Sequence, residues 1–455
     1  MSFDISVPKG WQLVKLSDLG EVNRGKSKHR PRDADFLYGG KYPFIQTGDV
    51  KASNGRINSF NQTYSNEGLK QSRLWPVDTM CITIAANIAE TGVLQFSACF
   101  PDSVIGFIAD KTKCDVYFIE YMFRLLKAKI KVQANGSVQD NINLQTLERI
   151  HFPIPDLVTQ KKIAQALGVL DDKIVQNNQM NQTLEQMAQA LFKSWFVDFE
   201  PVKAKIAVLE AGGSQEDATL AAMTAISGKD ADALAIFERE QPEQYAELKA
   251  TAELFPSAML ESELGAVPEG WMSASLGSIL EPKKGKNITK KTIEEGDVPV
   301  VAGGLAPAYY HSKCNVTGPV ITISASGANA GFVNLYHCDI WASDCSYINK
   351  TQTHFVYCFY TFLKIKQEEI THMQQGAAQP HVYPKDLMRL GIVVPTMALW
   401  KRLEEILNST YGQIGVHLNQ NMYLESLRDT LLPKLLSGEI TLPEAERAVS
   451  EAENV

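Results

Sequence analysis

Two clusters of lysine and arginine side chains dominate the chemistry that this 455-residue sequence could perform. Neither cluster follows the spacing of an amphipathic helix, so we expect both on loops. Such cations can neutralise DNA phosphates, and because the clusters recur at equivalent places, this role is as well supported as a merely solvated surface. The first cluster comprises Arg24, Lys26, Lys28, Arg30 and Arg32, and the second comprises Lys283, Lys284, Lys286, Lys290 and Lys291.

Side-chain amides and small polar residues form a second recurring group, around Gly136 and Gly376 and just after two β-branched runs. Asn and Gln can pair bidentately with adenine, and Ser can contact several bases, so these side chains could read a DNA groove. The alternative is a polar turn that caps the preceding helix. The residues concerned are Asn87, Gln133, Asn135, Ser137, Gln139, Asn141, Ser326, Asn329, Gln374, Gln375, Gln379 and His381.

One stretch, from Gly20 to Ser27, formally matches the phosphate-binding loop GxxxxGK[ST]. Such a loop must leave a buried strand and open a helix whose N-terminus holds the phosphates. Residues 17–19 indicate a turn or a short helix, and Pro31 follows too closely for a helix to begin readily. The equivalent stretch in the second half ends at Asn287, without the hydroxyl. We therefore expect no nucleotide site here.

Catalytic and metal-binding constellations are missing from the sequence. It has no Asn-Pro-Pro-aromatic or Asp-Pro-Pro-aromatic stretch of an amino-methyltransferase, and no glycine-rich cofactor loop follows a strand. The seven cysteines include no CxxC pair, so neither a disulfide framework nor a zinc knuckle is indicated. These absences predict a binding protein without catalysis, cofactor or metal of its own.

The elements that must position these groups include two long helices. Apolar residues recur at alternating steps of four and three over residues 163–195, which is the a/d seam of a helix packed on a partner helix. Adding 240 to each number gives a second, weaker seam over residues 403–435. A shared polar layer interrupts both seams, and such layers fix register. Its members are Asn177 and Asn181 in the first seam, and His417 and Asn421 in the second.

The segments before the two helices also repeat each other. Gly25-Lys26 matches Gly285-Lys286, and the β-branched runs 80–85 and 320–324 match as buried strands. Amphipathic helices are expected over 118–132 and 355–370, with closing strands over 150–154 and 390–394. The predicted fold is α/β (α+β): two similar mixed α/β domains, each followed by a long helix, in a pseudo-twofold repeat.

Six segments follow from this pattern. Residues 201–266 have no counterpart in the second half and are rich in Ala and Glu, so we expect a partly ordered acidic connector with possible short helices. The C-terminal tail is expected to be loose. The predicted segments are a first domain (1–158), a first long helix (159–200), the connector (201–266), a second domain (267–397), a second long helix (398–437) and the acidic tail (438–455).

The net charge of −8 is unevenly distributed. Residues 1–158 hold 19 Lys+Arg and 16 Asp+Glu, and residues 271–396 hold 11 and 9, whereas residues 159–270 hold 9 and 18. An acidic chain is not expected to bind DNA tightly alone, but it can read DNA beside a more basic partner. No apolar run approaches the ~20 residues of a membrane helix, and no signal peptide is evident, so a cytoplasmic protein is expected.

Taken together, these motifs resemble the specificity subunit of type I restriction–modification enzymes. The resemblance covers nearly the full length, except the connector. It is carried by the repeated openings Val7-Pro8-Lys9-Gly10-Trp11 and Val267-Pro268-Glu269-Gly270-Trp271, the exits Pro153-Ile154-Pro155 and Val394-Pro395, the entry Gln160-Lys161-Lys162-Ile163-Ala164, and the ending Leu435-Leu436-Ser437-Gly438-Glu439-Ile440.

The resemblance implies two target-recognition domains, each reading half of a split site in double-stranded DNA, held apart by two long antiparallel helices in a coiled coil. It implies two methyltransferase (M) subunits and restriction/translocase (R) subunits as partners, with S-adenosylmethionine, ATP and Mg on those partners only. Two alternatives remain: a coiled-coil adaptor without DNA specificity, and a fused or solitary modification enzyme. The first seam is ~48 Å long, comparable with the ~34 Å turn of DNA that would separate two recognition surfaces.

Overall fold

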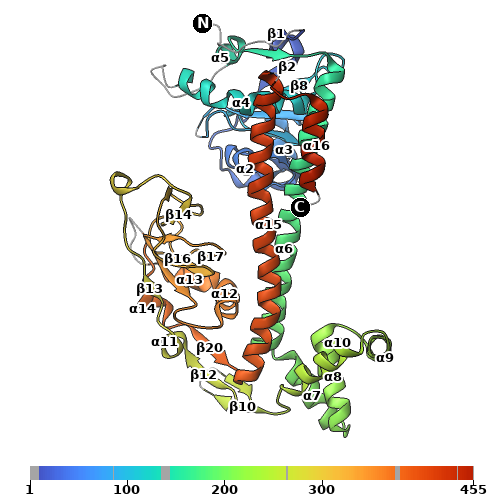
Figure 1. Ribbon diagram of the computed structural model, residues 1–455, viewed down its shortest axis with the longest axis vertical. Helices are drawn as coiled ribbons and strands as arrows, with labels where there is room; N and C mark the ends of the chain where they lie inside the picture. Colours follow the sequence, from blue (N-terminus) through green and yellow to red (C-terminus); the bar gives the residue numbers. More distant parts are fainter. Residues whose placement is uncertain are drawn as a thin grey trace. The chain divides into compact units, whose positions relative to one another are not determined.

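The computed structural model (Figure 1) describes residues 10–85, 87–134, 144–262, 265–374, 380–437 and 439–453. The chain divides into two compact units. The first unit comprises Met1–Asn177 together with Asn419–Val455, and the second comprises Asn178–Leu418. Each unit contains one mixed α/β domain, which we call the first domain (residues 11–155) and the second domain (residues 271–395).

A five-stranded sheet forms the centre of the first domain, in the order β2-β8-β6-β7-β4. Neighbouring strands are antiparallel, except that β4 runs parallel to β7. The helix α4 (Val116–Ala134) shares a buried apolar cluster with the sheet, to which Phe118, Met80 and Ile82 belong. The strands are β2 (Gly20–Arg24), β4 (Gly55–Ile57), β6 (Thr79–Thr83), β7 (Thr91–Leu94) and β8 (Val104–Ala109).

The second domain has a four-stranded antiparallel sheet in the order β13-β19-β16-β17. Its covering helix is interrupted after Ile365, so that the predicted helix 355–370 is two helices, α12 (Val356–Ile365) and α13 (Gln367–His372). The strands are β13 (Lys283–Lys284), β16 (Val320–Ser324), β17 (Val333–Tyr336) and β19 (Cys345–Asn349).

The two domains have the same topology, which confirms the predicted repeat. The order β2-β8-β6-β7 is matched strand for strand by β13-β19-β16-β17. A separate antiparallel pair closes each domain, β1 (Gln12–Lys15) with β9 (His151–Ile154) in the first and β12 (Met272–Ser275) with β20 (Gly391–Val394) in the second. Pro153 is accommodated because its strand pairs on one side only.

Smaller elements complete the domains. A second sheet pairs β3 (Tyr38–Phe44) with β5 (Gln62–Tyr64), and its counterpart is β15 (Tyr309–His311), β14 (Val298–Val301) and β18 (Trp341–Ala342). A hairpin of β10 (Met259–Ser262) and β11 (Gly265–Pro268) precedes the second domain. The short helices are α1 (Leu16–Leu19), α2 (Thr47–Ala52), α3 (Asn66–Lys70), α5 (Leu144–Glu148), α11 (Leu276–Ile279) and α14 (Pro384–Leu387).

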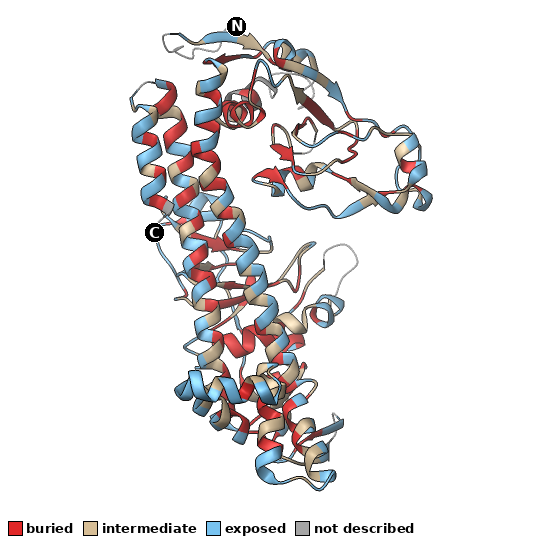
Figure 2. Cartoon of the chain, turned by 90° about the vertical axis from the view of Figure 1, so that its right-hand side faces the viewer, coloured by how far each residue is buried: buried red, intermediate tan, exposed pale blue. Residues whose placement is uncertain are grey.

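The predicted long helices are α6 (Leu157–Phe196) and α15 (Met397–Ser437), and both contribute to each unit. In the first unit they are antiparallel, because Asp171 contacts Arg428 while Asn177 contacts Asn421. The first seam turns its apolar residues inward, so that α6 alternates buried and exposed faces (Figure 2). The four residues of the polar layer meet as Asn177 with Asn421, and Asn181 with His417.

The acidic connector is more ordered than expected, because it forms four helices, three of which correspond to the short helices expected from the sequence at residues 219–226, 230–239 and 242–254. The last three of these helices share a small apolar core that includes Ala222, Met223, Leu234 and Ala252. Lys205 anchors the group by donating its ammonium protons to two backbone carbonyls, those of Ala252 and Phe255. The helices are α7 (Glu200–Glu210), α8 (Gln215–Ser227), α9 (Ala231–Glu240) and α10 (Pro242–Glu253).

The C-terminal tail is also not loose, because it forms helix α16 (Leu442–Glu453). Thr441 begins this helix, where its backbone N–H and hydroxyl both donate to Glu444. Ala445, Val449 and Ala452 are buried in the core of the first unit, at the 4-and-3 spacing of one helix face. Hydrophobic burial therefore orders this acidic segment.

Candidate nucleic-acid interface

The two basic clusters lie at equivalent places in the two domains, but not entirely on loops. Arg24 ends strand β2, and Lys283 and Lys284 form strand β13, so these three side chains project from the edges of the central sheets. The expectation of loop positions missed them because short edge strands carry little apolar pattern. The other members follow on exposed loops, except Lys290 and Lys291, which lie in the 3-10 turn Lys290–Thr292.

Two glycines turn the chain in the same way at the start of each basic loop. The N–H of Gly25 donates to Val104, and that of Gly285 donates to Cys345, the equivalent residue of the second domain. A Cβ on either glycine would lie 2.3 Å from a backbone carbonyl oxygen, that of Pro101 or Ser343. Only glycine therefore permits this close approach, which places Lys26 and Lys286 beside the sheet edge.

The basic residues of the first domain divide into two sorts. Arg32 forms an ion pair with Asp102, in which its Nη2 donates to both carboxylate oxygens at 2.9 Å. Arg30 donates from Nη1 to the carbonyls of Ser27 and His29, and it therefore braces its own loop. Arg24, Lys26 and Lys28 are exposed and have no ion-pair partner within the described residues. These three are better placed than Arg30 and Arg32 to meet an external phosphate.

In the second domain, Lys283, Lys284, Lys286 and Lys290 are all exposed, and none has an ion-pair partner among the residues that the structure describes. Trp341 holds the loop by donating from its indole N–H to the carbonyl of Lys286, at 2.8 Å. Four exposed cations thus lie on and after the edge strand β13, in a segment that Trp341 holds in place. Their number could have been read from the sequence, but their freedom from carboxylates could not.

The polar group of the second domain contains one compact cluster. Ser326 donates its hydroxyl to Asp344, and its backbone bridges that of His381. The imidazole of His381 stacks on the ring of Tyr383, with 5.7 Å between centroids. Asn329 lies on the same loop, half-buried. Ser326, Asn329 and His381 are therefore brought together, although His381 follows Ser326 by 55 residues in sequence.

Two of the predicted amides are engaged in the fold. Gln374 donates to the carbonyl of Ala330 at 2.9 Å, and Asn87 donates to that of Thr47 at 3.5 Å. Both contacts favour the alternative interpretation, in which the side chain holds a turn or loop, over a contact with DNA bases. Gln133 lies in helix α4. The remaining polar candidates lie outside the described residues, as do Val7, Pro8 and Lys9 of the first opening. These candidates are Asn135, Ser137, Gln139, Asn141, Gln375 and Gln379.

In each domain, the basic segment and the loop after the buried central strand meet along one segment of chain. In the second domain, the N–H of Lys286 donates to Ala342, and that of Ala325 donates to Asp344. In the first domain, the N–H of Lys26 donates to Phe100, and that of Ile84 donates to Ser103. The loops after β2 and β6, and those after β13 and β16, therefore lie side by side.

An exposed loop with apolar and aromatic residues borders this surface and was not predicted from the sequence. It joins β14 to β15 and exposes 58% of Leu305, while Tyr309 and Tyr310 are also exposed. A Cβ on Gly303 would lie 2.5 Å from the carbonyl oxygen of Ser326, so this loop touches the polar cluster. The doublets Gly303-Gly304 and Tyr309-Tyr310 were the available signal.

Three cysteine thiols are made unreactive by burial. Burial raises the pKa of Cys99 to about 11 and those of Cys114 and Cys345 to about 12, so these thiols stay protonated near neutral pH. Within the described ranges, no group of three His, Cys, Asp or Glu side chains could hold a metal. In the same ranges, no helix has the length and apolarity to cross a membrane.

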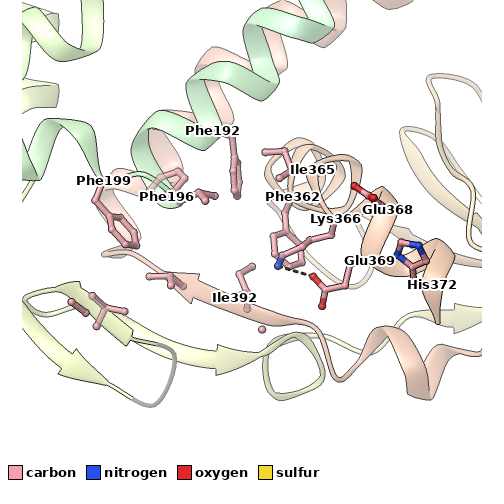
Figure 3. Close-up of a pocket in the computed structure, with 15 residues that line it drawn as sticks. Phe192, Phe196, Phe199, Phe362, Ile365, Lys366, Glu368, Glu369, His372 and Ile392 are labelled. Carbon is pink, nitrogen blue, oxygen red and sulfur yellow. Dashed lines mark hydrogen bonds and ion pairs between the residues drawn. The ribbon is translucent and has the colours of Figure 1, made fainter.

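The second unit also contains a hollow of about 800 Å³ at the end of α6 (Figure 3). Its walls are apolar, with Phe192, Phe196 and Phe362 facing Ile392, and its rim holds an ion pair of 2.8 Å between Lys366 and Glu369. None of the predicted site residues lines it. The hollow is thus separate from the basic and polar surface.

Two repeated domains on paired helices define a class of binding protein, and comparisons with known proteins identify it. Residues 8–186 and 268–419 match the family described as "Type I restriction modification DNA specificity domain". The HindI specificity subunit of Haemophilus influenzae is 31% identical over 374 residues, covering 73% of this chain and 80% of that protein. The MjaIX specificity subunit of Methanocaldococcus jannaschii is 24% identical over 474 residues, covering 96% and 95%.

The chain therefore belongs to the family of type I restriction–modification specificity subunits. Specificity subunits are the non-catalytic components of these systems. The solved structures that it resembles include the type I S subunit of M. genitalium, at a TM-score of 0.46 and 16% identity, covering 96% of this chain and 97% of that one.

Proposed function

We propose that each domain reads one half of a split DNA target. The observation that carries this proposal is the repeated arrangement, in which a basic segment and the loop after β6 or β16 meet along one strand-end segment in each domain. The loops beside the two basic segments differ in sequence, at residues 84–90 in the first domain and 325–330 in the second. Because the two domains share a fold but differ in these loops, we expect the two half-sites to differ in sequence.

The exposed cations would position the duplex, and the adjacent polar cluster would read bases. Lysine and arginine contacts with phosphates carry no sequence information, whereas hydroxyls and rings at base edges do. In the second domain, Ser326, Asn329 and His381 fit the reading role, and Leu305, on the loop that touches Ser326, is an exposed apolar contact.

Binding measured over a series of salt concentrations tests the cation role. The variant combines Lys283→Gln, Lys284→Gln and Lys286→Gln in the assembled complex, and the control is Lys401→Gln on the exposed face of α15. Each substitution that removes a phosphate contact should reduce the magnitude of the slope of log K against log salt by about 0.9. A triple variant with the slope of the control would refute the proposed surface.

We further infer that the methyltransferase subunits dock on the long helices. Several apolar side chains on these helices are exposed: Met180, Met187 and Val416 in the second unit, and Met422 and Tyr423 in the first. Exposed apolar groups on a helix are typical of protein interfaces. The restriction/translocase subunits would join this assembly in the cytoplasm, and S-adenosylmethionine, ATP and Mg would bind to the partners alone.

The helix pair would also set the spacer between the half-sites. Deleting one heptad from each long helix shortens it by ~10 Å, which corresponds to about three base pairs of DNA. Methylation of a DNA library with variable spacers should shift accordingly. An unchanged spacer would refute this role of the helix pair, but it would not contradict the proposal that each domain reads one half-site.

A further inference from the structure

The two domains contact the long helices at equivalent positions with different chemistry. In the first unit, the hydroxyl of Tyr121 on α4 donates to Asp171 on α6 at 2.6 Å. In the second unit, the hydroxyls of Thr361 on α12 and Tyr411 on α15 lie 3.0 Å apart. Each partner in the second pair follows its counterpart by 240 residues, so one contact is made twice with different side chains.

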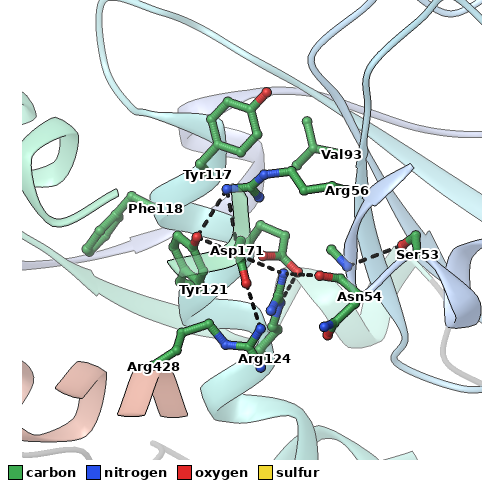
Figure 4. A network of polar contacts seen from close by, with 12 residues as sticks. Ser53, Asn54, Arg56, Val93, Tyr117, Phe118, Tyr121, Arg124, Asp171 and Arg428 are labelled. Carbon is green, nitrogen blue, oxygen red and sulfur yellow. Dashed lines mark hydrogen bonds and ion pairs between the residues drawn. The ribbon is translucent and has the colours of Figure 1, made fainter. Parts of the chain in front are cut away.

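The contact in the first unit is an ion cluster (Figure 4). Asp171 is 2% exposed and accepts from Nη1 of Arg428 at 2.6 Å. Arg56 and Arg124 of the first domain lie 3.7 and 3.6 Å from the same carboxylate. Asp171 is thus the shared counter-ion of two cations from the domain and one from α15.

The contact in the second unit is mainly aromatic, with one ion pair beside it, in which Lys364 of α12 lies 3.9 Å from Glu185 of α6. The ring of Tyr411 stacks on that of Tyr357, with 5.5 Å between centroids, and meets Tyr360 edge-on at 5.1 Å. The position equivalent to Arg428 is occupied by Ala188, which is buried. Helix positions that hold an acid and a base in the first unit therefore hold a phenol and a methyl group in the second.

The N-termini of α4 and α12 are capped differently as well. Asp115 accepts from the N–H groups of Tyr117 and Phe118, so α4 is capped from within its own domain. In contrast, α12 is capped by Glu404 of α15, which accepts from the N–H groups of Tyr357 and Cys358 at 3.1 and 2.8 Å. The position of α6 equivalent to Glu404 is Ala164.

We propose that these three pairs of helix positions form an address that seats each domain on its own helix segment. The pairs are Asp171 with Tyr411, Arg428 with Ala188, and Ala164 with Glu404. On the second segment, the first domain would bury Arg56 and Arg124 without Asp171, and Glu404 would lose its partners, since α4 is already capped. The address fixes the order of the domains and does not depend on what they read.

One part of the contact is shared, which limits the address to those three pairs. Glu425 accepts from Asn54 in the first unit, and its equivalent, Glu185, accepts from Tyr360 in the second. A domain placed on the other helix segment would therefore still meet a glutamate at this position. The residues at the three differing positions would not match it.

A pair of chimeras in the full chain tests the proposal. Residues 271–395 are replaced by a second copy of residues 11–155, either with the natural helices or with Tyr411→Asp, Ala188→Arg and Glu404→Ala. Hydrogen exchange of the transplanted α4 should be about tenfold slower, or more, with the altered helices. Equal exchange in the two chimeras, whether both are protected or both are open, would overturn the address.

A second measurement covers the case in which the chimeras fold poorly. In the natural chain, Asp171→Tyr with Arg428→Ala gives the first unit the second address at those two positions. Exchange of α4 should then quicken about tenfold while α12 is unchanged, and adding Arg56→Leu, Tyr121→Thr and Arg124→Leu should slow it again. A lack of recovery would count against the address, because general loss of packing would predict further loosening.

Discussion

The side-chain amide of Asn177 donates a hydrogen bond of 2.8 Å to Oδ1 of Asn421, which joins the two long helices inside the first unit. In the second unit, Nδ1 of His417 lies 2.7 Å from Oδ1 of Asn181. Since His417 is the 240-residue counterpart of Asn177, and Asn421 that of Asn181, one polar pair occurs once in each unit. The pseudo-twofold relation of the sequence thus extends to individual side-chain contacts.

Substituting this pair should change the stability of the first unit. Asn177→Ala removes a buried donor and should lower the free energy of unfolding by about 1–3 kcal/mol in a denaturant titration. Joint replacement with leucine, as Asn177→Leu and Asn421→Leu, should restore the stability, since two apolar groups leave no buried amide unpaired. The control is Gln176→Ala on the exposed face of α6. An Asn177→Ala variant as stable as the control would contradict this role.

Removal of the buried counter-ion should be far costlier. Asp171→Ala leaves the buried Arg56 without its carboxylate partner, while Arg124 keeps Glu120 and Arg428 keeps Asp429, and it should destabilise the first unit by about 3–5 kcal/mol. The neighbouring Asp172 is exposed, so Asp172→Ala should change stability little. Calorimetry of both variants provides the comparison. Equal unfolding temperatures would show that the cluster is solvated rather than buried.

The second unit should lose stability in mild acid. Burial lowers the pKa of His337, whose ring lies against Tyr357 at 6.4 Å. Because the unfolded chain then binds the proton more readily, this contribution is complete above about pH 6.5 and is lost as the pH falls through the folded pKa. The fall in unfolding temperature from pH 7 to pH 5 should therefore be smaller in His337→Gln. His354→Gln, at an exposed site, should retain the full fall.

The two turn glycines should not tolerate a methyl group. Gly25→Ala and Gly285→Ala each place Cβ 2.3 Å from a backbone oxygen, so we expect a loss of about 1–3 kcal/mol in the affected unit. Gly412→Ala is the matched control, since no atom lies within 4 Å of its Cβ and helix propensity favours alanine. Denaturant titration should separate the three variants, and two neutral turn variants would contradict the close approach.

The sequence revealed the parts of this protein that rest on local pattern. The predicted strands 80–85 and 320–324 correspond to β6 and β16, and both seams correspond to long helices, because the first seam has a strong apolar periodicity and the weaker second seam keeps the same register. Helix α16 was missed although Ala445, Val449 and Ala452 have helical spacing, because an acidic C-terminus was expected to be loose.

What could not be predicted depends on contacts distant in the sequence. Nothing local distinguishes Arg56 and Arg124, which meet Asp171, from Arg24, which lies at an exposed sheet edge. Likewise, whether an amide faces solvent or clamps a loop depends on the fold, as the bond from Gln374 to Ala330 illustrates. Charge clusters in the sequence therefore indicated a surface but not which of its members are free.

Mapping of methylated DNA in cells that express this chain with its methyltransferase tests the central claim most directly. The natural chain should direct methylation to a target of two specified parts separated by unspecified bases, and a foreign domain in place of residues 1–158 should change one part only. A continuous target, or a change in both parts, would contradict the assignment of one half-site to each domain.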